Sequence, residues 1–370
     1  MSKNTQVIPF TEIVERTSEL SSIRQEVASK VRGIINDIYV RDIPKKEDWS
    51  FMMKTTSLTL LAEYAVGTVS ANTGGTALTF SIDATITSSM TARKIKMSGN
   101  DYIYDFTFGG TTSGTIAPVL SGNQNVTSQS YSIFQPFYSL VNDFDRFPYD
   151  GGMHTFSGGS KKNIPEIGYK NYIANFRYTP NDSTENCRVV DTDTAGNRRV
   201  EIIPPSKTDR SVEYDYIHTL TPMRETTAGL VGNISASGTT VTGDSNTQFS
   251  LAQVGDYFRI DNFGRGSDSE WYRVLAINGN SSMTLATAFG LSGATSANYT
   301  ICTAPDMPSM MHPAILYGSL AQLTAIQDDP MALAYKQEYA NVLTDGKRIY
   351  KTRVYSQEVR HIGEDYMYRR

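Results

Sequence analysis

The stretch DTDTAGNRRVE, from Asp191 to Glu201, has residue types that could bind a calcium ion. Its opening Asp-x-Asp-x-x-Gly matches the start of a calcium-binding loop, in which closely spaced side chains supply oxygen ligands. However, Ala195 stands where such a loop needs an oxygen ligand, and Glu201 comes one position before the bidentate carboxylate, where Ile202 lies. Because Asp and Gly are also common in hairpin turns, the sequence favours a turn here over a metal site.

Other patterns that support catalysis or metal binding are missing from the sequence. It contains four histidines, which are His154, His218, His312 and His361. None of them has the His-x-x-x-His spacing of a metal site. The glycine-rich run from Gly151 to Lys162 lacks the Gly-Lys-Ser/Thr order of a phosphate-binding loop, and an exposed loop explains it. We therefore predict no catalytic residues, no metal and no cofactor, and a protein that is not an enzyme.

The C-terminal residues 347–370 favour protein docking. They hold seven Lys or Arg and three Asp or Glu, a local charge of +4, and because the whole chain carries −4, the remainder carries −8. Tyrosines alternate with the basic residues, and this mixture suits an acidic partner because rings bury apolar area and arginines bond carboxylates in pairs. A solvated, frayed terminus is the alternative. The residues predicted to dock are Arg348, Arg353, Tyr355, Arg360, Tyr366, Tyr368, Arg369 and Arg370.

Helical periodicity is found near the two ends of the chain. Between residues 18 and 39 apolar side chains recur every three or four positions, which predicts an amphipathic helix. Residues 313–327 repeat that pattern, and a further helix is expected from Pro330 to Gly346, since proline favours the first helical position and glycine the end. Their apolar stripes must be buried, so we expect both chain ends to form one helical bundle.

Between the helices the sequence is rich in strand-forming residues, and two stretches resemble each other. GTALTFSIDATITSSMTARKIKM, Gly75 to Met97, is a faint copy of GTTVTGDSNTQFSLAQVGDYFRI, Gly238 to Ile260. The similarity continues at a nearly constant offset to Tyr131-Ser-Ile and Tyr299-Thr-Ile. Each copy predicts about five short strands in a small barrel or sandwich.

These patterns predict an α+β fold, in which N- and C-terminal helices form a bundle and two repeated small β-barrel or sandwich modules are inserted. The expected domains are a helical core (1–60 and 304–346), β module 1 (61–135), a central β and loop region (136–228), β module 2 (229–303) and a basic docking tail (347–370). Arg259 and Trp271 lie on the second module. We predict that they contact subunits or partner proteins, with catalysis as the weaker alternative.

Composition narrows the class of protein. The chain has 370 residues, which suits two or three domains. Its negative charge argues against a free nucleic-acid binder. Two cysteines, Cys187 and Cys302, are too few for a disulfide framework. We expect no signal peptide, and no membrane helix because no run of about 18 apolar residues is present.

The order of these elements resembles the head-to-tail adaptor, or connector, proteins of short-tailed bacteriophages. The resemblance is carried by YSLVNDFDR (Tyr138 to Arg146), by a strand ending at Pro204-Pro205, and by the strand VEYDY (Val212 to Tyr216). We expect the last two strands to form a hairpin. Val141 stands where the family usually has proline. The resemblance covers most of the chain as a layout, through short motifs.

The resemblance implies a structural virion protein of the tail or neck, assembled in the host cytoplasm. It implies a ring of twelve subunits that joins the portal protein to the tail nozzle or tube protein, with the C-terminal tail reaching the portal. Tail fibres are a further candidate partner. DNA would pass through the channel without specific binding, and an acidic body fits this role because non-specific affinity rises with each phosphate neutralised.

Two other functions remain open from the sequence. The β modules also suit another phage tail protein, such as a tube, nozzle or fibre-anchoring protein, for which the basic tail would not be needed to bind the portal. A glycan-binding β protein is the third alternative, with Trp271 stacking on a sugar beside the acidic loop Asp268-Ser-Glu270. Strand alternation in Trp271-Tyr-Arg-Val explains that tryptophan equally well.

Overall fold

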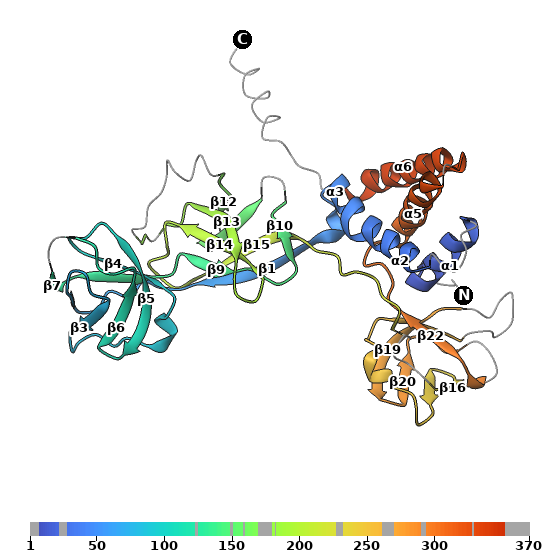
Figure 1. Ribbon diagram of the computed structural model, residues 1–370, viewed down its shortest axis with the longest axis horizontal. Coiled ribbons are helices and arrows are strands. Elements are labelled where there is room, and N and C mark those ends of the chain that lie inside the picture. Colours follow the sequence, from blue (N-terminus) through green and yellow to red (C-terminus); the bar gives the residue numbers. More distant parts are fainter. Residues whose placement is uncertain are drawn as a thin grey trace, which may run out of the picture. The chain divides into compact units, whose positions relative to one another are not determined.

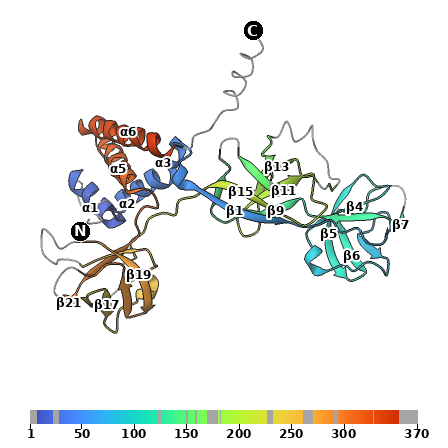
Figure 2. The same cartoon turned by 180° about the vertical axis from the view of Figure 1, so that it is seen from behind.

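The computed structural model (Figures 1 and 2) describes residues 7–21, 28–122, 125–148, 151–157, 160–168, 180–181, 183–226, 232–260, 270–289, 294–327 and 329–351. Its internal contacts divide the chain into two units. The described residues of unit 1 come from 1–52 and 219–353, and those of unit 2 come from 53–218. Each unit has apolar cores of its own.

Unit 1 contains a layer of helices drawn from both ends of its sequence (blue and red in Figure 1). These helices are α1 (Phe10–Leu20), α2 (Ala28–Asp37), α3 (Ile43–Lys46), α5 (His312–Ile326) and α6 (Met331–Tyr350). Helix α5 packs against α1, α2 and α6. It is apolar on all sides, as expected of a helix at the centre of a core, and Ile315, Leu320 and Leu323 are buried there. No described helix is long and apolar enough to span a membrane.

The helix boundaries partly follow the sequence prediction. The helix predicted at 313–327 is confirmed as α5. The single helix predicted at 18–39 is wrong, because α1 ends at Leu20 and α2 begins at Ala28, with residues 22–27 outside the described part. Helix α1 begins earlier than predicted, and the missed signal is its buried stripe of Phe10, Ile13, Val14 and Thr17.

Helix α6 does not end at Gly346, as the sequence predicted, but continues to Tyr350. Gly346 is buried inside the helix, where an added Cβ would lie 2.3 Å from Sδ of Met311 and 3.5 Å from the ring of Trp49. The glycine therefore allows close packing of α6, and this packing outweighs its low helix propensity.

The β domain of unit 1, here called module 2, is a seven-stranded antiparallel sheet. Its strands are β16 (Ile234–Ser237), β17 (Thr240–Gly243), β18 (Tyr257–Ile260), β19 (Tyr272–Gly279), β20 (Ser282–Leu285), β21 (Ala294–Ala297) and β22 (Tyr299–Cys302). They lie in the order β21-β16-β17-β20-β19-β18-β22. Phe249, Phe258, Met283 and Ile301 are fully buried in its core, which alternating inward-facing residues create.

Unit 2 contains a second seven-stranded sheet, module 1. Its strands are β2 (Val69–Ala71), β3 (Ala77–Phe80), β4 (Lys94–Met97), β5 (Ile103–Gly110), β6 (Ser113–Ala117), β7 (Val126–Gln129) and β8 (Tyr131–Phe134). Their order, β7-β2-β3-β6-β5-β4-β8, matches that of module 2 position by position. Registers match as well, because Met97 lies opposite Tyr131 as Ile260 lies opposite Tyr299. The same fold therefore occurs twice in the chain.

The rest of unit 2 consists of two smaller sheets. One contains β1 (Met53–Leu60), β10 (Phe144–Arg146), β11 (Gly152–Ser157), β12 (Ser160–Pro165) and β15 (Arg210–His218). The other contains β9 (Phe137–Ser139), β13 (Asn186–Thr192) and β14 (Arg198–Ile203). The hairpin predicted from β14 and β15 is wrong, because β15 pairs with β1 and β11 on its two sides and β14 pairs with β13 and β9.

The predicted fold class, an α+β helical bundle with inserted modules, is wrong. Strands account for 39% of the described residues and helices for 26%, in several curled antiparallel sheets. The sheets have apolar cores of their own, and unit 2 has one around Tyr138, Phe144 and Tyr214 that contains no described helix. The amphipathic stripes correctly placed helices near both ends of the chain, but most of the regular structure of the described residues is in sheets.

Candidate functional site

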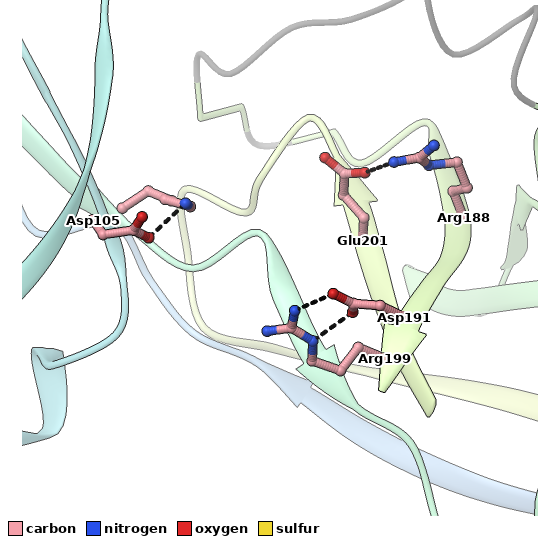
Figure 3. Close-up of polar contacts among 6 residues, drawn as sticks. Asp105, Arg188, Asp191, Arg199 and Glu201 are labelled. Atoms are coloured by element: carbon pink, nitrogen blue, oxygen red, sulfur yellow. Dashed lines mark hydrogen bonds and ion pairs between the residues drawn. The ribbon is translucent and has the colours of Figure 1, made fainter. Parts of the chain in front are cut away.

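The calcium-like stretch forms the turn between β13 and β14, as the sequence favoured. The Asp193 carboxylate accepts the backbone N–H groups of Ala195 and Asn197 at 2.9 and 2.8 Å. Asp191 accepts two bonds from the Arg199 guanidinium, at 2.7 and 2.5 Å, which hold its pKa below its ordinary value (Figure 3). Both carboxylates are used within the hairpin, and no described cluster of acidic, His or Cys side chains could hold a metal.

A second ion pair lies beside this turn. Glu201 on β14 is fully buried, and its Oε2 accepts a hydrogen bond from Nη2 of Arg188 on β13, the residue directly opposite, at 2.9 Å (Figure 3). Nearby, the Phe137 ring lies under two cations, Lys94 at 5.8 Å and Arg199 at 5.3 Å. Each cation also bonds a carboxylate, so these charges stabilise the contact of β9 with its neighbours.

The two cysteines are unsuited to nucleophilic chemistry. Both are buried, and Cys187 donates its S–H to the Ile164 carbonyl at 3.4 Å. Burial raises the pKa of the Cys187 thiol to about 12 and that of Cys302 to about 11. Since the thiolate is the reactive form, neither side chain is activated at neutral pH.

His312 has a structural role at the start of α5. Its Nδ1 accepts the backbone N–H of Ile8 at 2.9 Å, so the ring proton lies on Nε2, which donates to the Met307 carbonyl at 3.1 Å. Burial lowers the pKa of the imidazole below its ordinary value of 6.5. The neutral ring therefore joins the segment before α1 to the segment before α5.

Stability of unit 1 is expected to fall as pH decreases from about 6.5, because of His312. Below that pH the unfolded chain binds a proton at this side chain and the folded unit does not, so folding is favoured at higher pH. The contribution is complete above pH 6.5 and is lost as pH falls toward the lowered pKa. Thermal unfolding at pH 7.5 and 5.0 should show a larger decrease in Tm for the wild type than for His312→Gln, whose amide can make both bonds. Equal decreases would contradict this role.

Arg259 and Trp271, which the sequence singled out on module 2, lie together. The Arg259 guanidinium makes two bonds to the Glu15 carboxylate on α1, at 2.9 and 2.6 Å, and stacks over the Trp271 ring at 4.5 Å. Its side chain is only 14% exposed. In unit 1 this arginine joins the sheet to the helical layer, and the prediction that it contacts another protein stays a prediction.

A second ion pair of opposite polarity joins module 2 to the helices. Here the carboxylate comes from the segment before module 2: Glu225, which pairs with Cys302 on β22, accepts a bond from Arg32 on α2 at 2.7 Å. Asn36 adds two bonds to the backbone of Met223. Sequence analysis missed Glu15, Arg32 and Glu225, because their partners lie about two hundred residues away and no local pattern marks them.

The predicted docking tail lies largely outside the described residues. Of the residues proposed to dock, only Arg348 is described, on α6, with its Nη1 3.4 Å from Asp345. Arg353, Tyr355, Arg360, Tyr366, Tyr368, Arg369 and Arg370 lie outside. Two further basic residues of this segment, Lys347 and Lys351, face Glu47 at 3.7 and 3.2 Å.

Helix α6 has a large exposed surface. Along its twenty residues only Leu343 and Gly346 are buried. Apolar side chains on this helix are exposed, with Leu333 at 78% and Ile349 at 60%, and Ile326 at the end of α5 is 70% exposed. Leu333 and Ile349 lie near opposite ends of the helix, so they are separate exposed apolar side chains on a helix that is mostly exposed.

No family profile matches the chain, and no curated protein matches it in sequence. Among the described residues the charged side chains near the turn, the cysteines and His312 are engaged in packing and pairing. Two features of the described surface are open to contact with other molecules: the exposed helix α6, and a pocket beside module 1.

Proposed function

We propose that the protein is a structural component of a bacteriophage virion, a head-to-tail adaptor that forms a ring between the portal and the tail nozzle. The observation that carries the proposal is the exposure of α6, on which only Leu343 and Gly346 are buried and the apolar side chain of Leu333 would stay in water in a monomer. The repeated β module and the short motifs at Tyr138–Arg146 and Val212–Tyr216 support it.

In this proposal the function is assembly. A contact between two different surfaces of neighbouring subunits repeats around an axis and closes a ring when the rotation allows it. The outer side of α6 would provide one of these surfaces, and the basic residues 347–370 would bind the portal. The net charge of −4 would keep the channel from binding DNA tightly.

Full-length protein should form rings, of twelve subunits if the proposal is right, in mass photometry and negative-stain microscopy with and without a portal protein. Leu333→Glu should shift the protein to monomers, because it places a charge in the proposed contact. Ile82→Glu is the matched control, since Ile82 is 91% exposed on module 1. A wild type that stays monomeric in both conditions would overturn the proposal.

Deleting residues 352–370 separates the adaptor from the other tail proteins. An adaptor should lose binding to the portal, whereas a tube, nozzle or fibre-anchoring protein should assemble unchanged. The same variant should still show the unfolding transition of unit 1, since α6 ends before the deletion.

A further inference from the structure

The duplicated module allows one surface to be compared at two places in the chain. In module 2, Arg259 on β18 lies opposite Thr300 on β22, and in module 1, Lys96 on β4 lies opposite Ser132 on β8. The flanking residues correspond as well, since Ile260 and Met97 are the next inward-facing residues. Lys96 is therefore the counterpart of Arg259.

The acidic residues also correspond. Glu225 pairs with Cys302 at the end of β22. In module 1, Tyr64 pairs with Ile133, which places Glu63 beside the next residue, Phe134, the counterpart of Cys302. At each module the cation therefore lies on the equivalent strand, β18 or β4, and the carboxylate lies on a segment beside the end of the neighbouring strand, β22 or β8.

In module 2 this surface is occupied by protein. Glu15 on α1 bonds Arg259, and Arg32 on α2 bonds Glu225. In module 1 the counterparts, Lys96 and Glu63, have no hydrogen bond or ion pair from their side chains within the described part of the chain. The surface that binds a carboxylate in one module is thus open in the other.

An open pocket of about 390 Å³ lies at this surface of module 1. Its charged lining residues are Lys96, Lys207 and Glu63, and Met97 and Tyr131 also line it. Ser132 also lines it, and among the described residues its buried hydroxyl has no hydrogen-bond partner. The lining carries two cations and one carboxylate, so its net charge is positive. The pocket therefore favours an anionic ligand with oxygen acceptors.

We propose that this pocket binds an acidic side chain from a peptide segment of another protein. The occupant of the equivalent surface in module 2 is a glutamate on a helix, which indicates a protein carboxylate rather than a free anion. Lys96 takes the role of Arg259 and Lys207 adds a second cation. The inference does not depend on ring formation or on a phage origin.

The test uses full-length protein and a fluorescein-labelled hexaglutamate peptide, with hexaglutamine as the neutral peptide, in fluorescence anisotropy at low salt. Hexaglutamate should bind and hexaglutamine should not. Lys96→Gln should weaken binding by about three- to fivefold, the usual scale for one partly exposed charge pair. Lys161→Gln removes the same charge from an exposed position on β12, outside the pocket, and should leave binding unchanged.

Glu63→Gln is expected to strengthen hexaglutamate binding, whereas Lys96→Gln is expected to weaken it. The Glu63→Gln substitution removes a carboxylate of the pocket lining that repels the carboxylates of the ligand, so hexaglutamate should bind more tightly. Equal weakening by Lys96→Gln and Lys161→Gln would overturn the proposal, because binding would then follow net charge. Competition by inorganic phosphate as strong as that by hexaglutamate would overturn the assignment to a peptide and identify a general anion pocket.

Discussion

Replacing Trp49 with alanine is expected to destabilise unit 1 by about 3–5 kcal/mol, the usual cost of removing a large ring from a core. The Trp49 side chain is fully buried, its ring stacks on Phe51 at a centroid distance of 5.7 Å, and its Nε1 donates to the Ile43 carbonyl at 2.8 Å. Gly346 packs against the same ring. The substitution leaves a cavity at the contact of α3 with α6.

Tryptophan fluorescence measures this loss in unit 1 alone, because the sequence has two tryptophans and both belong to that unit. Trp271 remains as the reporter in the variant during denaturant unfolding. Trp49→Phe keeps an aromatic ring and loses the hydrogen bond, so its cost should be smaller, about 1–2 kcal/mol. A cost below about 1 kcal/mol for Trp49→Ala would contradict the packing described for this residue.

Arg188→Met is expected to destabilise unit 2 by about 3 kcal/mol. It leaves the Glu201 carboxylate buried without the Arg188 guanidinium, and removing one partner of a buried ion pair is strongly destabilising. The expected cost lies at the low end of the range usual for breaking a buried ion pair, because the Arg188 side chain is 23% exposed. Hydrogen exchange followed by mass spectrometry should show faster exchange in β13 and β14.

Two further variants separate charge burial from lost packing. Arg188→Met combined with Glu201→Leu should recover most of the stability, because the buried carboxylate is removed together with its guanidinium partner. Arg199→Met breaks the neighbouring pair with Asp191, whose side chains are 34% and 57% exposed, and should cost at most about 1 kcal/mol. A double variant no more stable than Arg188→Met would show that packing dominates at this site.

The local features of the fold could be predicted from the sequence. Apolar periodicity located α5, and the residue types of Asp191–Glu201 favoured the turn between β13 and β14. The similar stretches ending at Met97 and Ile260 lie at the same place in two sheets of identical strand order. Each of these features depends on residues that are close together in the sequence, so the local pattern of residue types is enough to predict it.

The contacts that join distant segments could not be predicted. Nothing near Pro204 indicates that β15 pairs with β1 instead of β14, since strand pairing depends on the competition of all available edges. Glu15 and Arg259 are residue types that are common on protein surfaces, and nothing in the sequence around either residue indicates that they form an ion pair in the folded unit. The same holds for Lys96 and Lys207, which only the folded unit places in one pocket.

The pairing of β1 with β15 determines the order in which the two units can be completed during synthesis. The described part of unit 2 runs from Met53 to His218, and its first and last strands are neighbours, so these strands can pair once residue 218 has left the ribosome. Helices α1 and α2 are made first but find their partner α5 only after residue 326. Until α5 is made, the apolar stripes of α1 and α2 lack the helix that buries them, and transiently exposed apolar surface of this kind is prone to aggregate.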